Sequence, residues 1–264
     1  MGKGKLAKFA DMERYENVFQ YPFSVVDNVP FEMKGRWSEM YFHNDNPIVL
    51  ELGCGRGEYT VGLARLFPDK NFIGVDIKGA RMWTGATESL REGLPNVAFL
   101  RTHIEFIQRF FAPGEVDLIY INFCDPWPSK LHAKLRLTHG NFRKLYRQVL
   151  KMGGQIHFKT DNQDLFEFSV TEIPSFGFTL SEITRNLHEN GPVGVMTDYE
   201  AKFHEQGMPI NRLVATMVPW EEPFPTDIDV VADRWLDAFA AGVSEANLGK
   251  YVLADGNYLW HIFS

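Results

Sequence analysis

The chain has 264 residues, of which 45% are hydrophobic and 23% charged, a composition typical of a globular protein with a sizeable core. No apolar run approaches the roughly 18 residues that a membrane helix needs, and no apolar stretch follows the N-terminal lysines as in a signal peptide, so we expect a cytoplasmic protein without membrane contact. The net charge of −7 argues against a nucleic-acid partner. However, residues 219–264 carry eight acidic side chains against two basic ones, which leaves the rest of the chain nearly neutral.

Five apolar runs of strand length recur along the chain, separated by segments with helical periodicity. They are IVLEL (48–52), NFIGVDI (71–77), VAFLR (97–101), VDLIYINF (116–123) and GQIHFKT (154–160). Runs this apolar are typical of strands buried on both faces, which predicts an α/β fold with a mostly parallel sheet and helices on both faces. Ligands collect beyond the carboxyl ends of such strands, so we expect functional residues just after each run.

Two further segments, 179–187 and 212–218, predict an antiparallel pair of strands that brings the sheet to seven. We divide the chain into an N-terminal arm with a first helix (1–44), the α/β domain (45–218) and a small C-terminal α+β appendage (219–264), in which a Pro-rich acidic linker precedes a helix and a hairpin. An apolar stripe on that helix would dock on the main domain or contact a second copy. The stripe consists of Val231, Trp235 and Phe239.

A glycine-rich turn follows the first run, in the segment ELGCGRGEY (51–59), and opens a helix. Its glycines, Gly53 and Gly55 among them, have the spacing GxGxG instead of the GxGxxG of dinucleotide-binding proteins. Glu51 places an acid where a cationic sulfonium and amino group would lie, and Asp76 ends the second run, where a carboxylate accepts hydrogen bonds from ribose hydroxyls. The pattern indicates a nucleoside cofactor, with structural glycines and a surface aspartate as the alternative interpretation.

The loop after the fourth run, NFCDPWPSKLHAKLRLT (122–138), is the most specific feature of the chain. The loop places three kinds of residue at the mouth of the expected crevice: an acid (Asp125), a proline that fixes the backbone (Pro126) and an aromatic ring (Trp127). Trp127 would either stack on a substrate or pack under the loop.

A basic band covers residues 125–160, which carry eight basic side chains and one acid. Within it, apolar spacing predicts a helix over 142–150 that Gly153 and Gly154 would end. The basic residues on the opposite face of this helix are Arg143, Lys144 and Arg147. The band indicates either RNA binding or a solvated surface.

The loop and several other motifs resemble the bacterial tRNA (guanine-N7)-methyltransferase family, from about residue 45 to 217. The other motifs occur in the family's order and are ELGCG, NFIGVD, FKTDN (158–162), LF (165–166) and TDYEAKF (197–203). The resemblance implies a class I S-adenosylmethionine-dependent methyltransferase, Rossmann-like in fold. Its substrate would be N7 of a guanine in tRNA, the guanosine at position 46 of the variable loop.

The resemblance also implies the site residues. Those expected to bind S-adenosylmethionine are Glu51, Gly53, Gly55, Asp76, His103 and Asp125. Asp125 would also be the catalytic carboxylate, because guanine N7 needs no general base but the ring becomes cationic as the bond forms. Those expected to bind the substrate are Lys130, Asp161, Thr197, Asp198, Tyr199 and Glu200. Those expected to contact RNA are His132, Lys134 and Arg136.

The chain departs from the family pattern at several positions. Three basic positions of the family loop are replaced by Ser129, Leu131 and Leu135, so phosphate binding would be weaker. His103 stands where the family has an acid that contacts the cofactor adenine. A neutral imidazole can accept the same hydrogen bond from the adenine amino group. The alternative is that His103 is a surface residue that does not contact the cofactor. Lysines of a mobile N-terminal arm would add tRNA contacts: Lys3, Lys5 and Lys8.

These departures leave two other hypotheses open, a catalytically silent tRNA-binding paralogue and a methyltransferase for another RNA or a small acceptor. The two cysteines, Cys54 and Cys124, fall at the ends of buried strands and form neither a disulfide framework nor a metal cluster, so we expect no metal. The sequence is compatible with a monomer or a homodimer.

Overall fold

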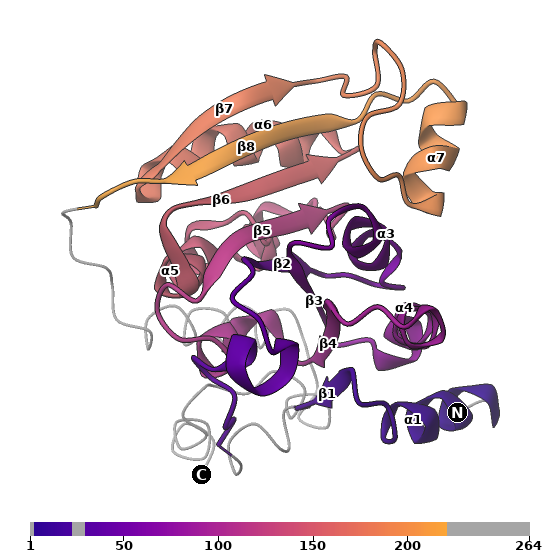
Figure 1. The fold of residues 1–264 in the computed structure, drawn as a ribbon. Coiled ribbons are helices and arrows are strands. Elements are labelled where there is room, and N and C mark those ends of the chain that lie inside the picture. The colour runs from indigo at the N-terminus through magenta and orange to yellow at the C-terminus, as the bar shows by residue number, and fades with distance from the viewer. Residues whose placement is uncertain (1–2, 23–29, 221–264) are drawn as a thin grey trace, which may run out of the picture.

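The computed structural model describes residues 3–22 and 30–220 (Figure 1). The helix and hairpin expected after residue 220 lie outside the described residues. The same holds for the stripe formed by Val231, Trp235 and Phe239.

A sheet of eight strands forms the centre of the described part of the chain, in the order β1-β4-β3-β2-β5-β6-β8-β7 (Figure 1). The strands are β1 (Val18–Gln20), β2 (Ile48–Leu52), β3 (Asn71–Asp76), β4 (Val97–Arg101), β5 (Val116–Asn122), β6 (Leu150–Thr160), β7 (Phe178–Thr184) and β8 (Asn211–Met217). Strands β1 to β6 run parallel, β8 is antiparallel to β6, and β7 is antiparallel to β8. The predicted parallel sheet with a closing antiparallel pair is confirmed.

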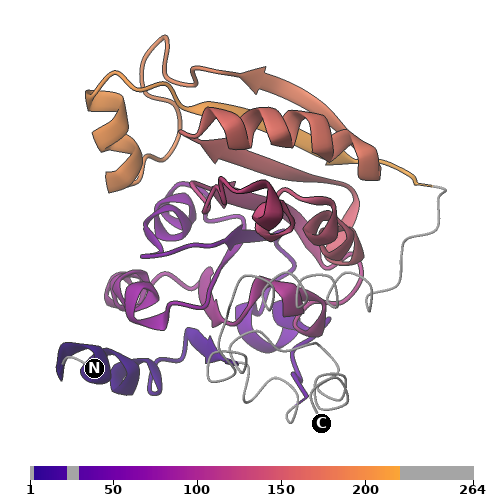
Figure 2. The same ribbon diagram turned by 180° about the vertical axis from the view of Figure 1, so that it is seen from behind.

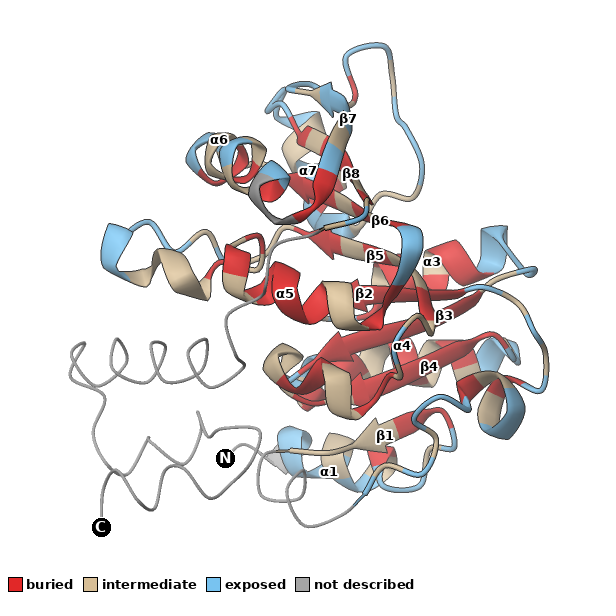
Figure 3. Ribbon diagram, turned by 90° about the vertical axis from the view of Figure 1, so that its left-hand side faces the viewer, coloured by how far each residue is buried: buried red, intermediate tan, exposed pale blue. Residues whose placement is uncertain are grey.

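Helices cover both faces of this sheet (Figures 2 and 3). They are α1 (Lys3–Met12), α3 (Glu58–Leu66), α4 (Gly79–Glu92), α5 (Gly140–Val149), α6 (Gln163–Glu172) and α7 (Asp198–Glu205). Shorter turns of other helix types are η1 (Ser38–Phe42), η2 (Ile104–Arg109), η3 (Lys130–Leu135) and η4 (Ile173–Phe176). Helices α3 and α4 lie on one side of the sheet and α5 and α6 on the other (Figure 3). No helix in the described ranges is both long and apolar enough to span a bilayer.

The sheet differs from the sequence prediction in two places. An eighth strand, β1, pairs with β4 at the edge, and three residues are too few for a strand pattern to be visible in the sequence. Strand β6 begins directly after α5 ends, so Gly153 and Gly154 lie inside the strand and do not end the helix. Gly153 has φ +78° in the stretch where the β5–β6 register shifts, which is typical of a glycine at a bulge.

Side chains of the central strands alternate between two apolar clusters, one on each face of the sheet. Leu50 and Leu52 of β2 pack with apolar residues of α5 and α6, whereas Val49 of the same strand packs with those of α3 and α4. These strands are therefore buried on both faces, as the red ribbons in Figure 3 show. The buried sheet holds the loops at its carboxyl edge in fixed positions.

The segments before residue 45 are packed onto the same sheet. Helix α1 contacts α4, and the ammonium of Lys8 lies 4.6 Å from the centre of the Trp83 ring. Trp37 is fully buried in the core on the α5 side, where its indole N–H donates to the carbonyl of Phe110 at 2.9 Å. Where the sequence predicts a mobile arm, apolar and aromatic contacts pack α1 and Trp37 against the domain.

Candidate active site

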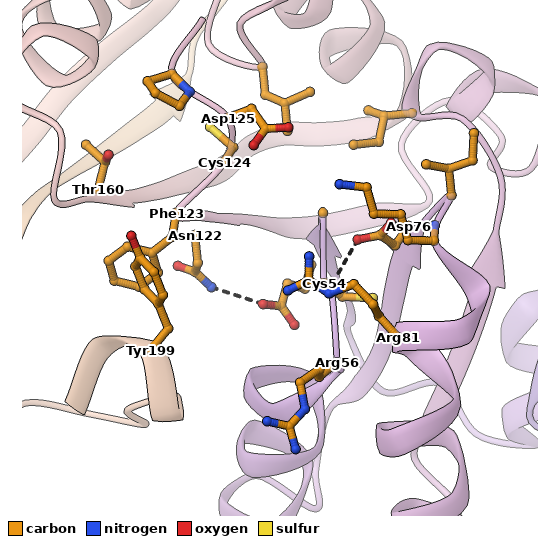
Figure 4. Close-up of a pocket in the computed structure, with 18 of the residues that line it drawn as sticks. Cys54, Arg56, Asp76, Arg81, Asn122, Phe123, Cys124, Asp125, Thr160 and Tyr199 are labelled. Atoms are coloured by element: carbon orange, nitrogen blue, oxygen red, sulfur yellow. Dashed lines mark hydrogen bonds between the residues drawn. The ribbon is translucent and has the colours of Figure 1, made fainter. Parts of the chain in front are cut away.

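One large cavity, about 1260 Å³ in volume, opens at the carboxyl ends of β2, β3, β4, β5 and β6. Figure 4 shows side chains converging on it from the glycine turn after β2, the end of β3, α4, the end of β5 with its following loop, the end of β6, and α7. The sequence-predicted residues that line it are Glu51, Gly53, Gly55, Asp76, His103, Asp125, His132, Asp161, Thr197, Asp198 and Tyr199. The rule that ligands bind beyond strand ends therefore located the cavity correctly.

The glycine turn lies on the floor of this cavity. Gly53 has φ +78° and its amide donates to the carbonyl of Val75 on β3 at 2.8 Å, so the chain bends sharply away from the end of β2. A Cβ at Gly53 would meet no atom within 4 Å, and the left-handed backbone favours glycine there. The turn thus leaves open space beside the backbone, where a ligand would lie.

Asp76 holds the turn from the end of β3. One carboxylate oxygen accepts the amide N–H of Gly55 at 2.9 Å, a bond drawn as a dashed line in Figure 4. The other accepts the amide N–H of Lys78 at 2.7 Å. An ionised carboxylate has about four acceptor sites, so each oxygen keeps capacity for another donor. Asp76 can therefore support the turn and accept two hydroxyl groups at once.

Glu51 is a buried acid at the cavity floor. Oε2 accepts the N–H and the hydroxyl of Thr60, and Oε1 accepts the side-chain amide of Asn122 at 3.3 Å. Burial raises the pKa of Glu51 to about 7, although the bonds from Thr60 and Asn122 and the charge of Lys159 act in the opposite direction. A cationic ligand above Glu51 would favour its ionised form.

Two buried oxygens in the cavity wall have no hydrogen-bond partner within the described residues: Oδ1 of Asn122 and Oγ1 of Thr102. Unpaired buried polar atoms are costly, so each suits a ligand group that completes its bonding. A ligand with ammonium, ribose and adenine groups, such as S-adenosylmethionine, fits this set of acids and orphan acceptors. Asn122 and Thr102 were not predicted from the sequence, although each is a polar residue that ends or follows an apolar run, which is the signal that would identify them.

Asp125 stands exposed at the cavity mouth, in the loop after β5 (Figure 4). No donor reaches its carboxylate from any residue in the two described ranges. The backbone around it is held in the left-handed region, with φ +50° at Phe123 and +45° at Trp127. Such conformations cost about 1–3 kcal/mol each and persist only where surrounding contacts impose them. The loop therefore presents an acid that is free to act on a ligand.

Arg136, which the sequence predicts to contact RNA, supplies some of those contacts. It is only 8% exposed, its guanidinium donates to the carbonyls of Pro126 and Trp127 at 3.0–3.3 Å, and it stacks 4.3 Å above the ring of Phe168. Its donors are directed at the loop and not at solvent. Arg136 thus braces the backbone next to Asp125.

We expect Arg136→Met to lower the free energy of unfolding by about 2–3 kcal/mol, because two loop carbonyls lose a charged donor and Phe168 loses its cation. Chemical denaturation measures this effect, with Lys130→Met as the matched control because Lys130 is exposed on the same loop. An unchanged unfolding energy combined with weaker tRNA binding would instead place the guanidinium on RNA.

The basic band is not one solvent-exposed surface. Arg143 is fully buried and donates to the carbonyl of Thr138 and to Glu172, at 3.1 and 3.3 Å. Arg147 donates to the carbonyls of Gly177 and Val218, at 2.7 and 2.9 Å. These cations fix the α5 side of the domain, so the helix face predicted to be basic and exposed is largely internal.

Helix α7 forms the wall next to the glycine turn. Thr197 caps it by accepting the N–H of Glu200 at 3.2 Å, and Asp198 bonds through its carboxylate to Arg56 at 3.2 Å, across from the N-terminus of α3. The Tyr199 ring lies 5.1 Å from that of Phe123, and its hydroxyl is 3.3 Å from an Asp161 oxygen (Figure 4). The sequence showed this motif but not that it forms a short helix.

Glu200, which the resemblance predicts to bind the substrate, does not line the cavity. It is fully buried, and its carboxylate accepts from Lys159 at 2.7 and 3.0 Å. Lys130 and Lys134 do not line the cavity either, whereas His132 does, with its ring 5.9 Å from that of Trp127. His103 lines the cavity at the start of η2, with an edge contact to Phe106.

Known proteins resemble this chain in sequence. Residues 45–213 match the model of a family described as "Putative methyltransferase". A tRNA (guanine-N(7)-)-methyltransferase from Bacteroides fragilis is 53% identical over 240 residues, which are 89% of this chain and 94% of the relative. A tRNA (guanine-N(7)-)-methyltransferase from Porphyromonas gingivalis is 52% identical over 209 residues, covering 76% of this chain and 85% of the relative.

Solved structures share the fold at low sequence identity. The 16S rRNA methyltransferase KamB has a TM-score of 0.54 at 18% identity, covering 69% of this chain and 92% of that one. A 16S rRNA (adenine(1408)-N(1))-methyltransferase from Catenulisporales acidiphilia, in a structure with its cosubstrate SAM, has a TM-score of 0.52 at 14% identity, covering 70% and 91%. These likenesses show a class I methyltransferase fold, in agreement with the strand order. With the family match and the 52–53% identical relatives, they establish that this chain belongs to the bacterial tRNA (guanine-N7)-methyltransferase family.

Proposed function

We propose that the protein transfers a methyl group from S-adenosylmethionine to N7 of a guanine in tRNA, the variable-loop guanosine at position 46, in the cytoplasm. The observation that carries this proposal is the shared cavity. Asp125, with a carboxylate open to a ligand, lines the same space as Glu51 and Asp76, whose positions suit a cationic nucleoside cofactor. One cavity of this size holds both reactants.

The floor and β3 side of the cavity would hold the cofactor, which supplies an electrophilic methyl group on a sulfonium. Glu51 and the orphan Oδ1 of Asn122 accept from the ammonium end. Each carboxylate oxygen of Asp76 accepts one backbone N–H, from Gly55 or Lys78, and has a further acceptor site for a ribose hydroxyl. His103 accepts from the adenine amino group as a neutral imidazole.

Asp125 and α7 would hold the guanine. N7 carries an in-plane lone pair and no proton, so the protein need not remove one, and orientation in line with the methyl group accounts for much of the rate. Asp125 stabilises the positive charge that develops on the ring. A base flipped out of tRNA needs an aromatic surface and polar partners, for which Trp127, Tyr199 and Asp161 are candidates because all three line the cavity.

The tRNA backbone would contact the loop beside the cavity through Lys130, His132 and Lys134. Lys130 is exposed and lies at the start of η3, next to the cavity wall. Leu131, which is 79% exposed, stands on this loop where the family has an arginine. Few cations on this loop face solvent. We therefore expect the loop to contribute little to the decrease of tRNA affinity with rising salt concentration.

Cofactor affinity should rise with pH in a way that reports on Glu51. Because burial raises its pKa to about 7, roughly one carboxyl in ten is ionised at pH 6 and nine in ten at pH 8. The cation binds the ionised form, so binding releases a proton and the affinity rises roughly tenfold between these pH values before levelling off. Calorimetry with S-adenosylmethionine measures this rise. Glu51→Gln should bind more weakly and show a flat profile over the same range; an unchanged slope in that variant would assign the titration to another group.

The reaction itself is tested by incubating the purified protein with unmodified tRNA transcript and S-adenosylmethionine, followed by nucleoside mass spectrometry. We expect 7-methylguanosine, and its loss when position 46 of the transcript is changed to adenosine. Methylation of a different nucleoside would contradict the proposed acceptor, and 7-methylguanosine that persists in the changed transcript would contradict the position.

A further inference from the structure

A buried charged cluster lies behind the cavity wall that α7 forms, and the proposed chemistry does not use it. It joins Lys159 near the end of β6, Glu200 in α7 and His188 in the segment that precedes α7. The Lys159 ammonium is 2.7 and 3.0 Å from the two Glu200 oxygens, and His188 Nε2 is 3.0 Å from one of them. Glu200 is fully buried, and the other two are 4–5% exposed.

Lys159 connects this cluster to the loop that carries Asp125. Its carbonyl accepts the N–H of Phe123 at 2.9 Å, directly at the residue with φ +50° where the loop leaves β5. Its ammonium lies 4.5 Å from the centre of the Tyr59 ring and 5.7 Å from that of Phe123. One residue thus contacts both the start of the catalytic loop and the anchor of α7.

The residues next to the cluster line the cavity. Tyr199 precedes Glu200, its ring contacts that of Phe123, and its hydroxyl lies 3.3 Å from Asp161, which follows Lys159 by two positions. Glu200 can move only if Tyr199 moves with it, because the two are adjacent in one short helix.

The energetics argue against a purely stabilising role for the cluster. Burial lowers the pKa of Lys159, and the charge and hydrogen bonds of Glu200 oppose this effect. Taking two charges out of water costs about as much as their attraction returns, so a well-packed apolar pair would serve stability as well. An apolar pair would not orient the helix. The hydrogen bonds from the Lys159 ammonium to the Glu200 carboxylate are directional, so they fix the rotation and position of α7 relative to β6.

We propose that Lys159, Glu200 and His188 form a positioning cluster that holds Tyr199 and Asp161 in register with the Asp125 loop for the incoming guanine. Glu200 acts through Lys159 and does not touch the substrate. The inference rests on the proposed function, since it assigns the far side of the same cavity to guanine. Among the described residues no member of the cluster hydrogen-bonds to the cofactor turn, and the cluster acts on the cofactor half only through the charge of Lys159 on Glu51.

The test compares Glu200→Gln, Lys159→Met and their double variant in three measurements: cofactor affinity by calorimetry, kcat and KM for tRNA, and thermal unfolding. We expect Glu200→Gln to bind S-adenosylmethionine within about threefold of the parent. Lys159→Met removes a charge that lowers the pKa of Glu51, so its cofactor affinity is compared above pH 8, where Glu51 is largely ionised, and should there also stay within about threefold. Each single variant should lose at least tenfold in kcat/KM for tRNA at temperatures where it remains folded. The double variant should lose little more than either single one, since the two act as a unit. Glu205→Gln, on the exposed end of the same helix, is the matched control and should behave like the parent.

A direct contact of Glu200 with guanine would appear as a loss in Glu200→Gln but not in Lys159→Met, and this overturns the proposal. Full activity in both folded variants overturns it as well. If either variant fails to fold, His188→Leu and His188→Gln replace them: glutamine retains a donor to Glu200 and should restore most of the tRNA kcat/KM that leucine loses. A parent protein that forms no 7-methylguanosine would refute the proposed function instead, before any variant is compared.

Discussion

Asp125→Ala should lower kcat for tRNA methylation by about 100- to 1000-fold, the loss typical when a single group that stabilises transition-state charge is removed. The carboxylate stands at the cavity mouth without a donor from the described residues, so it has no structural hydrogen bond to lose, and the loop stays braced by Arg136. Single-turnover methyl incorporation at saturating tRNA and cofactor measures the chemical step.

Asp125→Asn separates charge from shape, because the amide retains the size of the side chain without its negative charge. If Asp125 acts mainly by stabilising the cationic ring, kcat of Asp125→Asn should fall nearly as far as that of Asp125→Ala. Asp164→Asn is the matched control, since Asp164 is an exposed acid in the first turn of α6 and does not line the cavity. Turnover within threefold of the parent in Asp125→Ala would remove Asp125 from the reaction.

Asp76→Ala should weaken S-adenosylmethionine binding by about 100-fold or more. Two hydrogen bonds from ribose hydroxyls to a charged acceptor contribute roughly 3 kcal/mol together, which corresponds to this factor. The amides of Gly55 and Lys78 also lose their acceptor, so the turn that cradles the ligand loosens. Calorimetry at a pH above 8, where Glu51 is ionised, isolates the contribution of Asp76.

Asp69→Ala is the control for this comparison, because Asp69 is exposed in the loop before β3, at the opposite end of that strand from Asp76. The affinity of Asp69→Ala for S-adenosylmethionine should equal that of the parent. A cofactor affinity of Asp76→Ala within threefold of the parent would place the ribose elsewhere in the cavity and would contradict the assignment made from the end of β3.

The sheet was predictable because its central strands are buried on both faces and therefore nearly continuous in apolar character. The starts of β2 and β4 coincide with those of the runs IVLEL and VAFLR, and the acids that follow the runs line one cavity as the strand-end rule requires. β1 and α7 escaped prediction because three residues and eight residues carry too little periodicity, and α7 lies in a glycine-rich segment.

The direction of individual side chains was not predictable. Arg136 and Glu200 belong to motifs that indicate RNA and substrate, yet both are buried against partners that local spacing does not reveal: Glu200 pairs with Lys159, which is 41 positions away. A motif fixes residue type and order, whereas burial depends on contacts formed by the whole fold. The basic band is largely internal for the same reason. Arg143 pairs with Glu172, and Arg147 bonds to the carbonyls of Gly177 and Val218, in segments that meet α5 only after folding.

The most direct test of the account uses a tRNA transcript in which 7-deazaguanosine replaces guanosine, so that the proposed acceptor atom is a carbon without a lone pair. Binding of this transcript, measured beside the unmodified one, confirms that it still occupies the protein. The account predicts about one methyl group per unmodified tRNA and none on the deaza transcript. Equal methylation of the two transcripts would show that N7 of guanine is not the atom that receives the methyl group.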